Sequence, residues 1–155
     1  MLRVKIKKLY EDSIIPKKIT QDAGAYDVYC HRIEKVEDDL VICYTGICLQ
    51  PPSGYRICLV PRSSLTNHKW ILGNHFGIGD ADYTGEYQFR FRAIPAFIKS
   101  LNGIMSYLNY QNFPFKAGDR IGQLFLEKID EIEFIEVEEL SETERNTGGF
   151  GSSGL

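Results

Sequence analysis

The chain has 155 residues, a formal net charge of -3 and a pI of about 5.6. This length fits one domain with its own hydrophobic core, and the charge excludes a basic field that would attract nucleic acid. No apolar run reaches the roughly 18 residues of a membrane span or resembles a signal peptide. The four cysteines show neither C-x-x-C nor paired His spacing, so we expect reduced thiols in a soluble cytoplasmic protein without nucleic-acid or membrane partners.

Aromatic content and alternating apolar residues favour a strand-rich fold. Alternation predicts strands at residues 1–10, 41–49 and 55–60, and the turn Pro51–Gly54 predicts a hairpin between the last two. Residues 21–29 predict a small-residue turn that enters a strand. Asp27 lies between apolar neighbours there, so its carboxylate either braces the loop or faces a site.

The segment Pro61-Arg62-Ser63-Ser64-Leu65 follows a predicted strand and places a guanidinium beside two hydroxyls. These groups suit an anion site at a turn or helix start, and an ordinary serine cap is the alternative. Residues 68–70 are expected in a short helix.

The run from Asn74 to Glu86 is predicted to be a loop or hairpin tip, because three glycines and three carboxylates precede a new alternating strand at 87–92. Gly77 and Gly79 permit a close approach to the backbone, so the main chain can recognise a ligand. A polar turn is the plainer alternative. A calcium loop starting at Asp80 is excluded, because its twelfth position is Phe91 rather than Glu.

The last third combines an insertion, a strand and a glycine-rich tail. Apolar spacing predicts a helical insertion at about 95–112, and residues 115–126 predict a turn and an apolar strand that carry Asp119 and Gln123. Residues 127–144 are strongly acidic and are expected to form an edge strand and linker. In the tail 145–155, Arg145 and Phe150 lie among glycines, as a flap over a phosphate and a base would require.

Five of these segments, in this order, resemble the five motifs of the homotrimeric dUTPase family. They are Gly24–Val28, Pro61–Leu65, Asn74–Glu86, Gly118–Leu124, and Arg145 with Gly148–Gly154. The resemblance implies a jelly-roll-like all-β fold with a short helix after the second motif. It implies one domain at 1–144 and a flexible flap at 145–155 that completes a neighbouring active site in a trimer.

The resemblance also implies hydrolysis of dUTP to dUMP and pyrophosphate with Mg²⁺, which the substrate phosphates mainly hold. This reaction limits uracil incorporation into DNA and supplies dUMP for thymidylate synthesis. Asp80 would activate the attacking water and Arg62 would assist at the phosphates, with Asp27 and Asp119 in support and Asp119 orienting Arg62. The implied substrate-binding residues are Asn74, Gly77, Ile78, Gly79, Tyr83, Ser63, Ser64, Gln123, Arg145, Phe150, Gly151 and Ser152.

The sequence departs from the family pattern at Gly79, where an aliphatic residue usually precedes the catalytic Asp; we expect this to loosen the hairpin around Asp80. Two other functions stay open. A related dCTP deaminase would use a Glu after the central hairpin, for which Glu86 is the candidate. A non-catalytic regulatory protein would keep the nucleotide-binding fold and use the insertion as an interaction surface.

Overall fold

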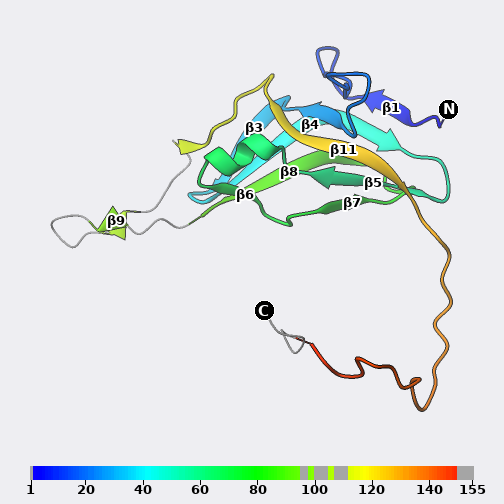
Figure 1. Ribbon diagram of the computed structural model, residues 1–155. Helices are drawn as coiled ribbons and strands as arrows, with labels where there is room; N and C mark the ends of the chain where they lie inside the picture. Colours follow the sequence, from blue (N-terminus) through cyan, green and yellow to red (C-terminus); the bar gives the residue numbers. More distant parts are fainter. Residues whose placement is uncertain (1, 95–97, 100–104, 107–111, 150–155) are drawn as a thin grey trace.

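The computed structural model describes residues 2–94, 98–99, 105–106 and 112–149, and their regular secondary structure is almost entirely strand (Figure 1). The strands are β1 (Lys5–Lys8), β2 (Tyr26–Tyr29), β3 (Arg32–Glu37), β4 (Leu40–Gln50), β5 (Tyr55–Val60), β6 (Trp70–Leu72), β7 (Gly77–Gly79), β8 (Glu86–Ala93), β9 (Ile98–Lys99), β10 (Met105–Ser106) and β11 (Arg120–Lys128). One 3₁₀ helix spans Ser63–Asn67. The prediction of an all-β fold is confirmed.

The strands form two main antiparallel sheets. Sheet A has the order β1-β4-β8-β6, with β3 also paired to β4, and sheet B has the order β2-β11-β5-β7. The predicted hairpin between β4 and β5 is therefore wrong, because the turn at Pro51–Gly54 carries the chain from one sheet to the other. Two consecutive prolines lack the N–H groups that a continuing ladder would need.

A single hydrophobic core lies between the sheets. Sheet A contributes Phe89 and Phe91, and sheet B contributes Ile57 and Ile121, all of them fully buried. Gly122 of β11 lets the sheets approach closely, because a Cβ there would lie 2.0 Å from Cε1 of Phe89. The core fixes the face that each strand presents, and with it the orientation of the polar side chains on the outer faces.

The 3₁₀ helix overlaps the second motif, and Thr66 Oγ1 donates to the carbonyl of Ser63 at 2.7 Å within it. The expectation of a short helix after that motif, at 68–70, is wrong. Trp70 begins β6 and pairs with Ala93. Its indole is 2% exposed and donates to the carbonyl of Asn112 at 3.1 Å, so burial of a large ring against sheet A outweighs local helix propensity.

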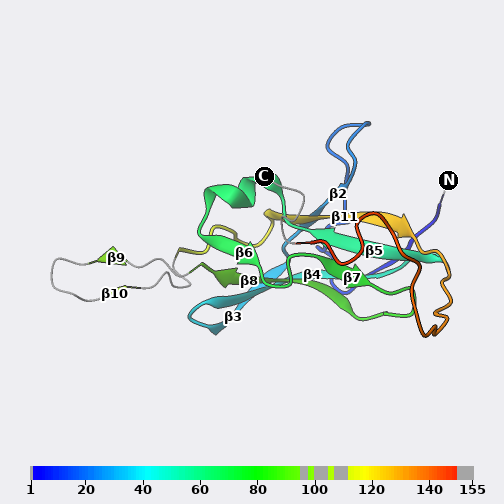
Figure 2. The ribbon, with the colours of Figure 1, turned by 60° about the horizontal axis from the view of Figure 1, so that its bottom comes forward.

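The helical insertion predicted at about 95–112 is also wrong for the residues that the structure describes there. Ile98–Lys99 pairs antiparallel with Met105–Ser106, and this β9–β10 ribbon projects away from the sheets in both views (Figures 1 and 2). The rest of the expected helix lies outside the described residues. The sequence between the two strands contains Asn102-Gly103, a strong hairpin signal that the apolar spacing concealed.

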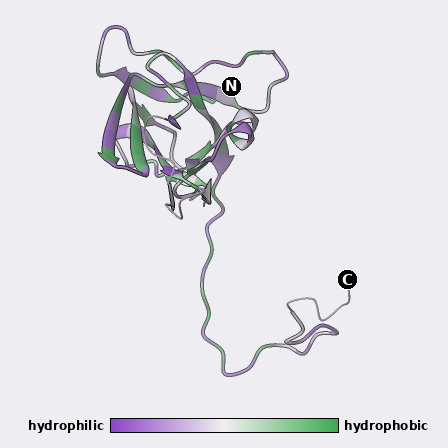
Figure 3. Ribbon diagram, turned by 90° about the vertical axis from the view of Figure 1, so that its left-hand side faces the viewer, coloured by the Kyte–Doolittle hydropathy of each residue, from purple (hydrophilic) through white to green (hydrophobic). Residues whose placement is uncertain are grey.

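After β11 the chain continues as an extended arm, defined here as residues 129–149, which leaves the sheets (Figure 3). The expectation of an edge strand is wrong, because β11 lies between β2 and β5 and the described residues beyond Lys128 form no strand. The arm exposes apolar side chains, among them Phe134 at 89% and Ile132 at 73%. Among the described residues, no helix has the length and apolar character of a membrane span.

Candidate active site

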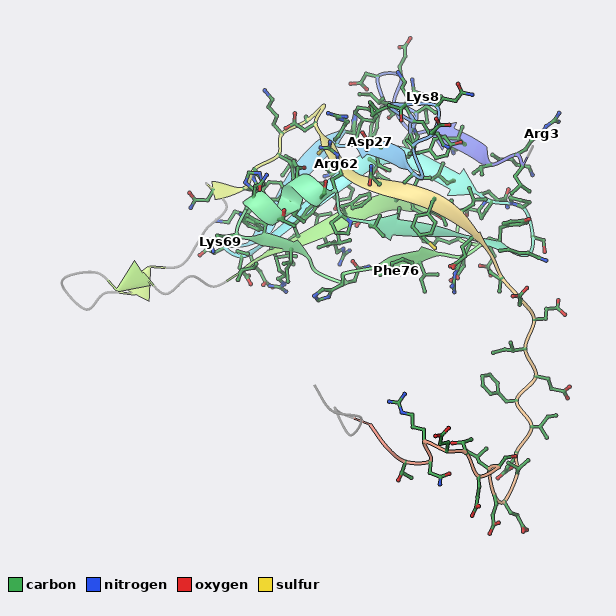
Figure 4. All side chains as sticks on the ribbon, viewed as in Figure 1. Arg3, Lys8, Asp27, Arg62, Lys69 and Phe76 are labelled. Atoms are coloured by element: carbon green, nitrogen blue, oxygen red, sulfur yellow. The ribbon has the colours of Figure 1, made fainter. Side chains whose placement is uncertain are left out.

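A buried carboxylate organises the polar end of sheet B. Asp27 of β2 is 2% exposed. Its carboxylate accepts a hydrogen bond from Arg120 Nη1 at 3.0 Å and another from Gln123 Nε2 at 2.9 Å. The Nε of Arg62 lies 3.6 Å from Oδ1 of Asp27 (Figure 4). We call these four residues the Asp27 cluster.

Strand register explains why these residues meet. Gln123 of β11 is paired with Asp27 on one side and with Val60 of β5 on the other. Arg62 follows Val60 by two residues, at the end of β5, and so reaches the same point. Three segments far apart in the sequence are thus joined by one buried acceptor.

The Asp27 cluster can bind an anion. It contains two guanidinium groups and one carboxylate, and the side chains of Arg62 and Arg120 are 23% and 39% exposed. Arg62 Nη1 also lies 3.5 Å from the hydroxyl oxygen of Ser64. Partly exposed guanidinium groups beside hydroxyls suit the recognition of phosphate oxygens.

The structure assigns the support of Arg62 to a different carboxylate from the one expected. Asp119 accepts a hydrogen bond from the backbone N–H of Lys116 at 2.8 Å, which braces the turn before β11. Asp27 instead lies beside the guanidinium of Arg62. The expectation that Asp119 orients Arg62 is therefore wrong.

The central glycine-rich run contains a strand as well as a turn. β7 pairs with β5 in sheet B, whereas β8 belongs to sheet A, so the turn at 80–85 connects the sheets. Of the two expected arrangements, a loop or a hairpin tip, the hairpin tip is wrong, because the strands on either side of the turn lie in different sheets. Within β7, Gly77 and Gly79 are buried, whereas Ile78 is exposed, as is Asp80 directly after the strand. The exposed carboxylate of Asp80 is thus presented at the end of a short backbone segment.

The turn places Tyr83 beside this segment. Its ring is 45% exposed, and its hydroxyl donates to the carbonyl of Glu86 at 3.0 Å. The backbone N–H of Tyr83 also donates to the carbonyl of Asp80 at 3.2 Å, which closes the turn. Asn74 precedes β7, and its Nδ2 would lie 3.4 Å from a Cβ at Gly77. An accessible ring, a carboxylate and an exposed strand backbone are thereby grouped.

The two groups lie apart within one chain. Asp80 comes one residue after the Ile57↔Gly79 pair and therefore lies beside Arg56 on β5. Arg62 is six residues further along the chain, which corresponds to about 20 Å at about 3.3 Å per residue. One chain does not bring Asp80 to an anion bound at the Asp27 cluster.

The structure describes residues 145–149 of the C-terminal tail. Arg145 belongs to the extended arm, and its Nε donates to the carbonyl of Gly148 at 2.7 Å. Phe150, Gly151 and Ser152 lie outside the described residues.

Two residues of this region were given no role on sequence grounds. Arg120 was noticed only at the start of its strand, and it makes the 3.0 Å contact with Asp27. Tyr87 looked like one more apolar position of an alternating strand. No local sequence pattern indicates its contact with β7, because β7 and β8 belong to different sheets.

The fold and these two groups define an all-β protein with an anion-binding cluster and a separate exposed carboxylate on a glycine-rich segment. The dUTPase family model matches residues 11–95 and 100–154. A deoxyuridine 5'-triphosphate nucleotidohydrolase of Helicobacter pylori (strain Shi470) is 34% identical over 158 residues, which cover 99% of this chain and 98% of that protein. The chain belongs to the dUTPase family, as its five motifs predicted.

Solved structures agree on the fold. A mutant dUTPase of Staphylococcus bacteriophage 80alpha, solved with dUpNHpp, gives a TM-score of 0.81 at 22% identity and covers 99% of both chains. A mutant dUTPase from phage phi11 of S. aureus, described with a structural Mg(II) ion, gives a TM-score of 0.72 at 19% identity and covers 90% of this chain and 99% of that chain.

Proposed function

We propose that this protein hydrolyses dUTP to dUMP and pyrophosphate. The observation that carries the proposal is the family match, which includes both the Asp27 cluster and the segment of Asp80. The Helicobacter pylori relative, which this chain matches along nearly its whole length, is named for the same activity. Such a reaction limits uracil incorporation into DNA and supplies dUMP for thymidylate synthesis.

The Asp27 cluster is the proposed triphosphate site. Arg62 and Gln123, with the hydroxyls of Ser63 and Ser64, would contact phosphate oxygens. Asp27 would hold Arg62 and Gln123 in place, since it already contacts both side chains. Charge develops on phosphoryl oxygens during transfer, and prearranged guanidinium and N–H donors stabilise it.

Asp80 is the proposed general base. Its exposed carboxylate would orient and deprotonate the water that attacks the α-phosphorus. The ring of Tyr83 would pack on the deoxyribose, and its exposure leaves a face free for this contact. Asn74 and the backbone at Gly77–Gly79 would read uracil, because β7 lies at the edge of sheet B and one side of its backbone pairs with no other described strand.

The roughly 20 Å between Asp80 and Arg62 requires that two copies of the chain build each site. We therefore propose a homotrimer with shared active sites. The arm supports association, because exposed side chains such as Phe134 and Leu140 need an apolar partner surface. A groove of about 470 Å³, lined in part by Val4, Tyr26 and Leu124, is the proposed surface for the arm of a neighbouring copy.

The tail at 145–155 is proposed to act as a flap over a neighbouring site. Arg145 would reach the γ-phosphate and Phe150 would cover the uracil, while Gly151 and Ser152 would contribute backbone N–H groups to the phosphates. Ordering a glycine-rich segment costs about 1–2 kcal/mol per residue, so ligand contacts must offset this cost for the flap to close.

Mg²⁺ is the proposed cofactor. Within the part of the chain that the structure describes, no three His, Cys, Asp or Glu side chains gather as a metal site. The proposed ion is held mainly by the triphosphate oxygens of the substrate. When bound, Mg²⁺ would neutralise charge on those oxygens.

Glu86 distinguishes this proposal from a deaminase. Its carboxylate accepts a hydrogen bond from the backbone N–H of Gly46 at 2.7 Å and so ties β8 to β4. A residue held in this way supports the turn after Asp80 and is poorly suited to act as the acid and base of a deamination. The four cysteines are free thiols, which supports the proposed cytoplasmic location.

Substrate selectivity tests the function directly. Purified protein with Mg²⁺ is expected to release pyrophosphate from dUTP far faster than from dTTP, UTP or dCTP. Asp80→Asn should lower kcat by roughly 10²- to 10⁴-fold while dUTP still binds. Ammonia release from dCTP would favour the deaminase, and tight dUTP binding without turnover would favour a regulatory protein.

A further inference from the structure

Tyr87 of β8 occupies the space that a side chain at position 79 would need. A Cβ at Gly79 would lie 2.3 Å from Oη, 2.6 Å from Cε1 and 2.8 Å from Cζ of Tyr87. These distances are far shorter than any normal contact. The ring therefore reaches from sheet A to the inner face of β7 in sheet B, directly before Asp80.

β7 has little packing of its own on that inner face. It is a three-residue strand at the edge of sheet B, and its two inward positions are glycines. Because successive positions alternate between faces, Gly79 faces Tyr87, and Asp80 is directed to the exposed side. The Tyr87 ring and the Asp80 carboxylate thus lie on opposite sides of one short backbone segment.

Tyr87 is itself held firmly. It is 3% exposed, and its carbonyl accepts a hydrogen bond at 2.7 Å from the hydroxyl of Thr45, which is 1% exposed. The ring of Tyr83 packs edge-on against it, with centroids 5.5 Å apart. Tyr87 is therefore a fixed support rather than a mobile side chain.

The contact does not depend on a hydrogen bond from the hydroxyl, and ring atoms Cε1 and Cζ fill the space together with Oη. In the described part of the chain, the buried Oη of Tyr87 has no hydrogen-bond partner. Burial, with smaller effects from Tyr83, Asp80 and Cys48, raises the pKa of Tyr87 to about 12, so the ring is neutral at physiological pH. A neutral ring without a polar partner acts through its shape.

We propose that Tyr87 is a positioning residue for Asp80, because its ring supports β7 where Gly79 provides no side chain. This inference rests on the proposed role of Asp80. It also replaces the expectation that Gly79 loosens the hairpin, since the space beside Gly79 is filled from the other sheet. Gly79 and Tyr87 then act together, and a substitution at either position changes the orientation of the Asp80 carboxylate.

Four variants test the proposal by steady-state dUTP hydrolysis and thermal unfolding. Tyr87→Val removes the support and Gly79→Val creates the clash, so each should lower kcat by about 10- to 100-fold with a much smaller change in KM. The double variant places a side chain in the same space from the opposite sheet, and it should recover most of the lost kcat. Tyr87→Phe keeps the ring and should retain kcat.

The outcomes separate positioning from general stability. The proposal would be overturned if Tyr87→Val lowered Tm and left kcat unchanged. It would also be overturned if the double variant had a kcat no higher than that of the less active single variant. If a single variant fails to fold, the double variant and Tyr87→Phe still decide, because both fill the space. If the wild-type protein did not turn over dUTP, the proposed function would be rejected. Asp80 would then have no catalytic role, and Tyr87 would have no catalytic carboxylate to position.

Discussion

The Asp27 carboxylate shows how a single side chain assembles a binding surface. A carboxylate that is 2% exposed needs donors close at hand. Asp27 receives them from Arg120 and Gln123 and lies beside Arg62. The same contacts leave both guanidinium groups partly exposed. The interactions that satisfy the buried carboxylate of Asp27 therefore also arrange the guanidinium groups for anion binding.

Removal of the Asp27 charge should therefore affect both stability and substrate binding. Asp27→Asn is expected to lower the free energy of unfolding by about 1.5–3 kcal/mol, the range for hydrogen bonds to charged groups. It should also raise KM for dUTP, because Arg62 and Gln123 lose a common anchor. Thermal unfolding and steady-state kinetics measure the two effects.

Asp119→Asn provides a matched control. Its side chain keeps an oxygen that can accept from the N–H of Lys116, so stability and KM should change little. A larger rise in KM for Asp119→Asn than for Asp27→Asn would contradict the assignment of Asp27 as the support of Arg62.

Tyr87 should make stability fall at alkaline pH. Folding raises its pKa from a usual value of about 10 to about 12. The neutral form therefore contributes stability that is complete below about pH 10 and is lost as the pH rises through about 12. In urea unfolding, the free energy of unfolding of the wild-type protein should fall between about pH 10 and pH 12 relative to that of Tyr87→Phe. If the free energies of both proteins changed equally with pH, the buried and unpartnered hydroxyl would be contradicted.

Sequence reasoning went furthest where the chemistry is local. The guanidinium and hydroxyls of Arg62–Ser64 were identified as an anion site from residue type and spacing, whereas the role of Asp80 was implied by the resemblance to the dUTPase family. The resemblance assigned Asp119 rather than Asp27 to Arg62, and this was wrong because the contact depends on the register of β2 and β5 against β11. The Gly79–Tyr87 contact was also out of reach, since it joins strands of different sheets.

At the scale of elements, alternation located the strands but not their partners. β4 and β5 were recognised as strands on either side of a turn, yet they belong to different sheets because each finds its neighbours far along the chain. The prediction of a helical insertion failed for another reason. Apolar spacing of three and four residues matched a helix, whereas β9 and β10 form a two-stranded ribbon.

The extended arm offers a prediction at this scale. Phe134→Asp is expected to weaken association, because it places a charge where the arm should contact an apolar surface of another copy. Its side chain is 89% exposed in the single chain, so folding of one chain should be unaffected. Light scattering after size-exclusion chromatography measures the mass of the assembly.

Glu133→Gln, on the same arm, is the matched control and should leave the mass unchanged. An unaltered mass for Phe134→Asp would show that the arm does not hold the copies together through this ring.

For the whole molecule, the separation of the two groups is the deciding feature. Asp80 and Arg62 are about 20 Å apart along β5, a distance fixed by strand geometry, and a single chain has no means of closing it. The resemblance of the five motifs to the dUTPase family predicted a site that is shared between subunits. The register of β5 and β7 supplies a physical reason for it.

Complementation between two inactive variants tests this shared site most directly. As pure proteins, Asp80→Asn and Arg62→Ala should each lose most of the turnover, by roughly 10²-fold or more for Asp80→Asn. Random mixing of the two should restore up to about one quarter of wild-type activity, because that share of adjacent pairs in a closed oligomer combines an intact Asp80 with an intact Arg62. Mixed assemblies no more active than either parent would contradict a site built from two copies.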